Sequence, residues 1–439
     1  MSSRGASASK RAAPPLEYSL LLTATLCLLA FGAVMVFSAS SARSLLNSGG
    51  NGFYYLERTL VFGAIGLVVM RVAAVRGVAA VKPLTPLILL SSVFLLFAVL
   101  LPGIGHQVNG SQRWVGAGLV QFQPSELAKI ALVLYGAYLL SAEPKRTRTL
   151  GGLGPYLLTV GLSVLLIAKE PDLGTAIIVS FAVFSVLFLA GVRPRTLAPV
   201  AALIAIVALG TIAMNPYQSA RLTGFLHPGT DTSGSGFQAK QATIAVGSGG
   251  VFGVGLGESV QKASYLPEAH TDMVAAVIGE ELGLAGMFVL IGLFGMFGYA
   301  GLRAAHRARD RFSKLLAAGL TALIMSQAAL NLFAVLGLAP LTGVPLPFVS
   351  YGGTSLILML AAAGLILNVA RRPAAQASGR RGSGRGGRAT AGGPARLRVV
   401  QGGTHTRRKR AASGKSRDSG RRHGGARRAG DRRRRRASG

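Results

Sequence analysis

The sequence has few of the charged side chains that cover a water-soluble protein. Only 14% of its 439 residues are charged and only 15 are acidic, whereas half are apolar. So little charge cannot cover the surface of an ordinary soluble fold of this length. The one cysteine, Cys27, excludes an intramolecular disulfide and a metal site built from cysteines. The composition therefore predicts a membrane protein.

Several motifs of soluble enzymes are also missing. The sequence holds no Walker-type phosphate loop, no His-Glu-x-x-His metal motif and no Gly-x-Ser-x-Gly nucleophile elbow. The glycines of segment 247–257 follow no strand-to-helix dinucleotide unit, so they do not indicate a nucleotide site. We expect neither a nucleotide nor an organic cofactor.

The positive charge is concentrated at the C-terminus. The formal net charge is +32, but residues 371–439 hold 23 of the 47 Lys and Arg and only two acids, Asp418 and Asp431. Such a segment buries too little apolar area to fold. We predict a cytoplasmic N-terminal segment (1–15), a membrane domain (16–370) and a disordered Arg-rich tail (371–439). The tail is expected to bind anionic lipid or an acidic partner, and the alternative is that it only anchors the topology. No nucleic-acid partner is expected.

Apolar runs long enough to cross a bilayer recur along the membrane domain. A hydrocarbon core about 30 Å thick needs about 20 residues of helix. The predicted spans are 16–40, 58–81, 83–102, 125–141, 152–168, 173–190, 196–213, 272–301, 315–338 and 351–370. The predicted fold class is an all-α polytopic membrane protein of about ten transmembrane helices, with a large extracytoplasmic loop between the seventh and the eighth.

Lys and Arg predict the orientation of these spans. Clusters that contain Lys145, Arg193 and Arg303 follow the fourth, sixth and eighth spans, and the N-terminus is basic too. Because positive loops lie in the cytoplasm, both termini are expected there, and segments 105–124, 214–271 and 340–353 are expected to face outward. The glycine-rich 214–271 is expected to be partly re-entrant or surface-lying, or else a flexible loop.

Two charged residues open the fourth span. Glu126 and Lys129 are three residues apart, so they share a helix face and can pair. Ionisable groups at the membrane boundary usually turn toward a protein interior or a water-filled cavity. The pair is predicted either to bind substrate in such a cavity or to fix helix packing, and both roles can hold.

A second acidic site lies where the long loop becomes the eighth span. Asp272 follows Glu268 and His270, and a carboxylate there is placed either to cap the helix or to act as a general base at the mouth of a cavity. Glu280 and Glu281 lie two turns further on, where a structural role with a polar partner is the better prediction.

Four cations lie on the predicted outer side, where the positive-inside bias would not place them. These are Arg113, Arg221, Lys240 and Lys262. An anionic ligand such as a phosphate would explain them. Solvated surface charge remains the alternative for each.

The motifs together resemble those of the SEDS family of bacterial envelope proteins. The resemblance covers nearly all of the membrane domain, and it is carried, in chain order, by GSQRWVGAGLVQFQPSELAK, EPDLGTA, YQSAR, FLHPGTD, GFQAKQATIAVGSGG, YLPEAHTD, IGEELG and GVPLPFVSYGGTSL. IGEELG and GVPLPFVSYGGTSL are more similar to the division branch than to the elongation branch. Met273 departs from the family pattern, which usually has an aromatic residue there, and so does segment 108–112.

The resemblance implies a peptidoglycan glycosyltransferase that joins lipid II units outside the cytoplasmic membrane at the division septum. It implies a class B penicillin-binding protein as partner and Asp272 as the catalytic aspartate. The predicted substrate-binding residues are Glu126, Lys129, Arg113, Lys240, Lys262 and His270. A divalent cation, Mg or Mn, would help the diphosphate to leave. The alternatives are a lipid II flippase, the elongation-type polymerase, or a scaffold that only activates its partner.

Overall fold

The computed structural model describes residues 14–47, 51–108, 111–116, 121–227, 234–264, 266 and 268–371. The predicted N-terminal segment and Arg-rich tail lie almost entirely outside these described residues. Eight of the described helices are long and apolar enough to span a membrane.

The helices follow one another with few strands between them. In chain order they are α1 (Leu16–Asn47), α2 (Tyr54–Val99), α3 (Pro124–Ala142), the 3-10 turn η1 (Pro144–Arg148), α4 (Leu150–Lys169), α5 (Leu173–Leu189), α6 (Pro194–Met214), α7 (Pro216–Leu226), α8 (Ser235–Ser248), α9 (Gln261–Ser264), α10 (Val274–Glu281), α11 (Gly283–His306), α12 (Arg311–Val335) and α13 (Gly353–Arg371). Two short antiparallel strands, β1 (Gly105–Val108) and β2 (Ser111–Val115), form a hairpin after α2.

Helix α2 is two spans joined at Gly77, whose φ of 37° and ψ of −130° break the helix. Gly77 lies against the side chain of Asn368, near the end of α13. Tyr55, before the break, contacts Tyr351 just before α13. After α2, Gln121 accepts a hydrogen bond from Thr354 at the start of α13. The chain therefore runs along α13 to Gly77 and turns back.

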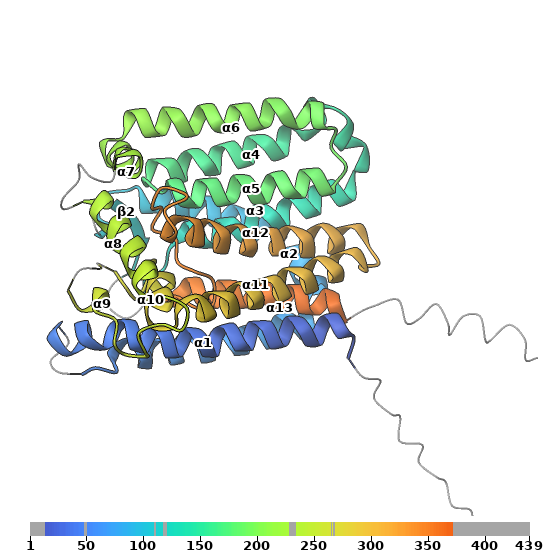
Figure 1. The fold of residues 1–439 in the computed structure, drawn as a ribbon. Coiled ribbons are helices and arrows are strands. Elements are labelled where there is room, and N and C mark those ends of the chain that lie inside the picture. The colour runs from blue at the N-terminus through green and yellow to red at the C-terminus, as the bar shows by residue number, and fades with distance from the viewer. Residues whose placement is uncertain are drawn as a thin grey trace, which may run out of the picture. The chain divides into compact units, whose positions relative to one another are not determined.

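Ten membrane spans result, as the sequence predicted. The eight long apolar helices become nine spans when α2 is divided, and the shorter apolar helix α5 is the tenth. In Figure 1 the spans lie side by side, and the start of α1 and the end of α13 lie at the same end of the bundle. Helices α7, α8, α9 and α10 gather at the other end. We call this the loop end, and it comprises residues 100–108, 111–116, 121–123, 215–227, 234–264, 266, 268–273 and 338–352.

The predicted eighth span, 272–301, is wrong in its first third. The helix stops at Leu282 and restarts at Gly283, where φ is 63°, so α10 is a separate short helix and α11 is the span. Gly253 packs directly on the backbone of Glu281 at this break. The two glutamates at the end of α10 and Gly283 mark the place of the break in the sequence, but its cause is the segment that packs on it.

The long loop between α6 and α10 is ordered by hydrogen bonds along this break. The backbone N–H groups of Val254 and Gly255 donate to the carbonyls of Glu280 and Glu281 at 3.0 and 3.1 Å. In return, the N–H of Leu284 donates to Gly250 at 3.0 Å. The glycine-rich segment therefore has partners for much of its backbone, as a segment at membrane depth requires. Its predicted re-entrant placement remains a prediction.

An ion-pair cluster fixes the opposite end of the bundle. Glu17 of α1 is buried and lies 2.8 Å from the Arg303 guanidinium and 2.6 Å from that of Arg307, both at the end of α11. Cations at a helix C-terminus also complement its dipole. This contact holds α1 beside α11 far from the loop end.

Candidate functional site

Asp272 lies at the loop end, where several loops meet. Its backbone carbonyl accepts a 2.8 Å hydrogen bond from Asn331 Nδ2, and the same nitrogen donates to the Val344 carbonyl at 2.8 Å. Asn331 is buried on α12, so it ties two loops together. The N-cap of α10 is Met273, without a side-chain cap bond. The capping alternative for Asp272 is therefore wrong, and its half-buried carboxylate is left for other chemistry.

The surroundings of Asp272 suit a base. Burial raises the pKa of its carboxyl to about 6, and Glu268 adds to that rise, while the Arg221 guanidinium and the hydroxyl of Thr271 act to lower it. The Thr271 hydroxyl donates to Asp272 Oδ1 at 3.2 Å. A pKa near 6 leaves the carboxylate ionised at neutral pH but more basic than an exposed aspartate.

Arg221 of α7 faces Asp272 across Gly343. A Cβ placed on Gly343 would lie 3.6 Å from both terminal nitrogens of Arg221 and 3.8 Å from Asp272 Oδ2. Arg221 Nη1 donates to the Leu341 carbonyl at 3.2 Å, and Nη2 donates to the Tyr217 hydroxyl at 2.7 Å. A cation and a carboxylate thus flank one exposed glycine.

Arg113 of β2 is already bound by protein. Its Nε donates to the Glu170 carbonyl at 2.9 Å, and its Nη2 donates to the Pro171 carbonyl. Gln218 of α7 donates to the same Pro171 carbonyl. Arg113 therefore joins the β-hairpin to the turn between α4 and α5, and its predicted substrate contact remains a prediction.

The turn between α4 and α5 holds a buried acid. Glu170 is fully buried, and among the described residues neither of its carboxyl oxygens has a hydrogen-bond partner. Burial raises the pKa of Glu170 to about 9, the Asp172 charge adds to the rise, and Arg113 opposes it. Asp172 caps α5 by accepting from the Thr175 N–H at 3.1 Å.

His270 lies between two tyrosines. Its ring centroid is 4.2 Å from that of Tyr55 and 5.6 Å from that of Tyr351. The Tyr351 N–H donates to the His270 carbonyl at 3.0 Å. His270 is buried, so these contacts fix the turn that leads into Asp272, and the predicted substrate contact of the ring is untested.

The predicted pair of Glu126 and Lys129 is present and buried. Lys129 Nζ donates to Glu126 Oε1 and to Gln327 Oε1, each at 2.7 Å. Ser355 donates to Glu126 Oε2 at 2.9 Å, and Gln327 donates to the Pro345 carbonyl at 2.9 Å. This network joins α3, α12, α13 and the loop before α13. Such a closed set of contacts fits the structural role, and substrate binding by the pair remains a prediction.

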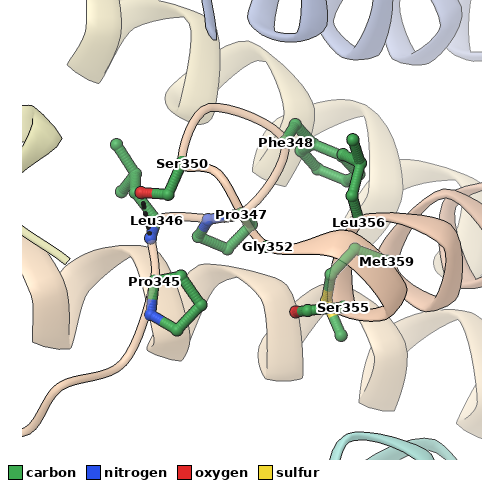
Figure 2. Close-up of a pocket in the computed structure, with 9 residues that line it drawn as sticks. All are labelled: Pro345, Leu346, Pro347, Phe348, Ser350, Gly352, Ser355, Leu356 and Met359. Carbon is green, nitrogen blue, oxygen red and sulfur yellow. Dashed lines mark hydrogen bonds between the residues drawn. The ribbon is translucent and has the colours of Figure 1, made fainter. Parts of the chain in front are cut away.

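A small cavity adjoins this network. Figure 2 shows it between the loop that carries Pro345, Leu346 and Ser350 and the first turns of α13, with Ser355 on its wall. The Leu346 N–H donates to the Ser350 hydroxyl at 2.9 Å and closes the loop over it. Its free space holds about one water molecule, which is far too little for a sugar. Substrate therefore does not fit there.

Lys262 and the two glutamates of α10 form a second buried network. Lys262 Nζ lies 2.5 Å from Glu281 Oε1 and 3.1 Å from the Ser38 hydroxyl. Glu280 accepts from the Ser259 hydroxyl and from the Val260 N–H. Both glutamates therefore have the polar partners that the sequence predicted for them, and their structural role remains a prediction. Lys262 is buried too, and its predicted contact with substrate is untested.

Lys240 is exposed on α8. Of the four outer cations, the structure brings only Arg221 beside Asp272. The sequence analysis named Arg221 among the outer cations but did not include it in the predicted substrate-binding set, and it did not single out Asn331 or Gly343. The sequence signals of Arg221 were its charge on the outer side and its place in the YQSAR motif. Asn331 was only a polar residue inside an apolar span, and Gly343 only one glycine among many.

The described residues do not fit a metal site built by the protein alone. Among them, no three His, Cys, Asp or Glu side chains lie together as ligands would. Mg²⁺ is often held by one or two carboxylates together with the phosphates of a substrate. The expected Mg or Mn would accordingly be held with the help of substrate phosphates, and it remains a prediction.

The fold and site define a ten-span membrane protein with a carboxylate and an arginine facing each other at one end. The model of the family described as "Cell cycle protein", which unites FtsW, RodA and SpoVE, matches residues 18–374. The chain belongs to this family, as the resemblance to SEDS proteins implied.

Individual relatives agree over almost their whole length. The probable peptidoglycan glycosyltransferase FtsW of Geobacter sulfurreducens is 40% identical over 355 residues, which cover 80% of this chain and 95% of the relative. A chain from "Structural coordination of polymerization and crosslinking by a peptidoglycan synthase complex" matches with a TM-score of 0.67 and 29% identity, covering 81% of this chain and 97% of that one. The rod shape determining protein RodA of Thermus thermophilus matches with a TM-score of 0.58 and 28% identity, covering 81% and 96%.

Proposed function

We propose that the protein is a peptidoglycan glycosyltransferase that joins lipid II units into glycan strands at the outer face of the cytoplasmic membrane during cell division. The observation that carries this proposal is Asp272, a half-buried carboxylate whose pKa burial raises to about 6, at the exposed loop end. The family and the 40% identity to an FtsW protein named as a probable peptidoglycan glycosyltransferase support the same activity.

Asp272 is the general base in this proposal. The attacking hydroxyl of one sugar needs to lose a proton as it bonds to the anomeric carbon of the next, and the Asp272 carboxylate accepts that proton. The bond from the anomeric carbon to the diphosphate breaks in the same step, and the diphosphate leaves with the electron pair. This is a single inverting displacement without a covalent enzyme intermediate. A divalent cation, Mg or Mn, bound to the diphosphate would offset its charge.

The loop end faces outward in this proposal. The basic segments that the positive-inside rule assigns to the cytoplasm lie at the opposite end, where Arg303 and Arg307 pair with Glu17. A lipid-linked substrate supplies its own leaving group, so an outward-facing enzyme needs no nucleotide sugar. The expected partner is a class B penicillin-binding protein that cross-links the strands, and the likeness to a chain of a peptidoglycan synthase complex supports this.

A polymerisation assay with purified components tests the function. The purified chain, with and without its penicillin-binding partner, is incubated with lipid II, and the glycan length is measured on gels. Polymer is the expected result. Reconstitution into vesicles with labelled lipid II distinguishes the flippase, because labelled lipid would cross the membrane without polymer. Polymer that forms only when the partner's own activity is intact would favour the scaffold.

A further inference from the structure

Gly343 occupies an unusual place between Asp272 and Arg221. It is exposed, although Thr342 and Val344 on either side of it are buried. A Cβ there would be 3.8 Å from the Asp272 carboxylate and 3.6 Å from the Arg221 guanidinium. The absence of a side chain therefore leaves an open space between an acid and a cation, and we call the space bounded by these three residues the Gly343 notch.

The acid and the cation of the notch face each other without forming an ion pair. No direct ion pair joins them, yet each lies within 3.8 Å of the position that a Cβ on Gly343 would take. In a direct ion pair the two side chains would neutralise each other and would have fewer hydrogen-bonding positions left for a ligand. The observed spacing instead leaves room for a ligand group that contacts both, and Asn331 keeps the spacing by binding the carbonyls of Asp272 and Val344.

Arg221 has donors left for an anion. Among the described residues its guanidinium donates to the Leu341 carbonyl and to the Tyr217 hydroxyl, which uses two of the five N–H donors of an arginine. Its carbon Cζ also lies 4.7 Å from the centroid of the Tyr217 ring. These contacts hold the guanidinium in place, and the remaining N–H groups suit the oxygens of a phosphate.

We propose that the Gly343 notch is the reaction subsite, in which Arg221 binds the departing diphosphate while Asp272 accepts the proton of the attacking hydroxyl. This inference rests on the proposed function and adds a residue and a space to it. In an inverting displacement the base and the leaving group lie on opposite sides of the anomeric carbon. Asp272 and Arg221 flank Gly343 as two separate groups, and the proposal places the attacking hydroxyl by the first and the diphosphate by the second. Arg221 then stabilises charge that appears only as the bond breaks.

Substitutions at the notch have matched controls in this chain. Gly337 has a φ of 69°, close to the 70° of Gly343, but a Cβ there would meet only the Thr243 hydroxyl at 3.4 Å. Gly343→Ala and Gly337→Ala therefore carry the same backbone strain, and only the first fills the notch. Arg303 is the matched control for Arg221. Its guanidinium also lies over a tyrosine one turn earlier in its helix, Tyr299, but it is at the opposite end of the bundle.

The experiment measures polymerisation rate, thermal unfolding and binding of inorganic pyrophosphate in purified variants. We expect Gly343→Ala to lose at least tenfold in rate while Gly337→Ala keeps it, with similar falls in Tm. We expect Arg221→Gln to lose about 100-fold in rate and to lose pyrophosphate binding, with Arg303→Gln retaining both. Equal rates for the two glycine variants would contradict the assignment of the Gly343 notch as the reaction subsite. Pyrophosphate binding that survives Arg221→Gln would contradict it as well.

The pH profile separates a role in the reaction from a structural one. Asp272 is flanked by Arg221, Glu268 and Thr271, and Arg221 is the cation that acts to lower its pKa. The acidic limb of the residual activity of Arg221→Gln should therefore move to higher pH, while Arg221→Lys should keep it near the original position. An unmoved limb would contradict the proposal. Absence of polymer from the unaltered chain would instead refute the proposed function, and pyrophosphate binding would still test the notch.

Discussion

The Lys262 ammonium lies 2.5 Å from the Glu281 carboxylate, and both side chains are buried. This pair joins α9 to α10, and Ser38 of α1 adds hydrogen bonds to both partners. It therefore fixes the end of the long loop just before and after the turn that carries Asp272. The sequence predicted that Lys262 binds substrate. In the structure its charge is already paired with Glu281.

Lys262→Met should destabilise the fold. It leaves the Glu281 charge buried without its cation, which costs about 3–5 kcal/mol, and thermal unfolding in detergent measures the loss. The double variant Lys262→Met/Glu281→Gln should recover much of it. Lys240→Met, on the exposed face of α8, is the control and should change stability by less than about 0.5 kcal/mol. A raised KM with an unchanged Tm in Lys262→Met would instead support the predicted substrate contact.

The polymerisation rate should fall in acid. Burial raises the pKa of Asp272 to about 6, and a general base works only when deprotonated. Because the charged form is lost below this pKa, kcat/KM should be level above pH 7 and fall about tenfold per pH unit below pH 6. A pH-rate profile on purified protein measures this. A profile that stays flat down to pH 4.5 would show that no group with such a pKa takes the proton.

Glu170→Gln should stabilise the protein more at high pH than at low pH. The folded-state pKa of about 9 is above the ordinary value of 4.5, so between these values the folded state holds a proton that the unfolded state has released. Stability then falls as pH rises through this range. The amide removes that dependence. The difference between the Tm at pH 5 and the Tm at pH 8 should be larger for the native chain than for Glu170→Gln. Equal differences would contradict a buried neutral Glu170.

The glycine-rich segment before α9 should contact lipid. Phe252 is 84% exposed, and Leu284 and Phe288 at the start of α11 are 51% and 70% exposed beside it. This apolar surface is continuous with a membrane span, and the backbone of the segment is hydrogen-bonded to the break before α11. We expect Phe252 to lie in the outer leaflet, since exposed apolar side chains there gain by leaving water.

A nitroxide on Phe252→Cys, in a Cys27→Ser background and in lipid nanodiscs, measures this placement. Collision with oxygen should exceed collision with a water-soluble nickel chelate, as for Phe288→Cys. A label on Lys240→Cys should collide more with the nickel chelate than with oxygen. A label at position 252 that behaves like the one at position 240 would place the segment in water.

The number of spans was predictable because each needs a long apolar run. The break between α10 and α11 was not, because the apolar stretches on both sides of Glu280 and Glu281 are continuous enough to suggest one helix, and the interruption comes from Gly253 packing on Glu281. Asp272 was predictable from its place before a span. Its partner Arg221 was not, because a sequence does not show which cations are already paired, as Arg113 and Lys262 are here.

Polymerisation by Asp272→Asn tests the central claim most directly. The amide is the same size as the carboxylate and keeps the backbone contact to Asn331, so the variant should fold with an unchanged Tm and still bind its partner. The loss of a general base should reduce polymer from purified lipid II by about 100- to 10,000-fold. Polymer of normal length and yield from this variant would contradict the account.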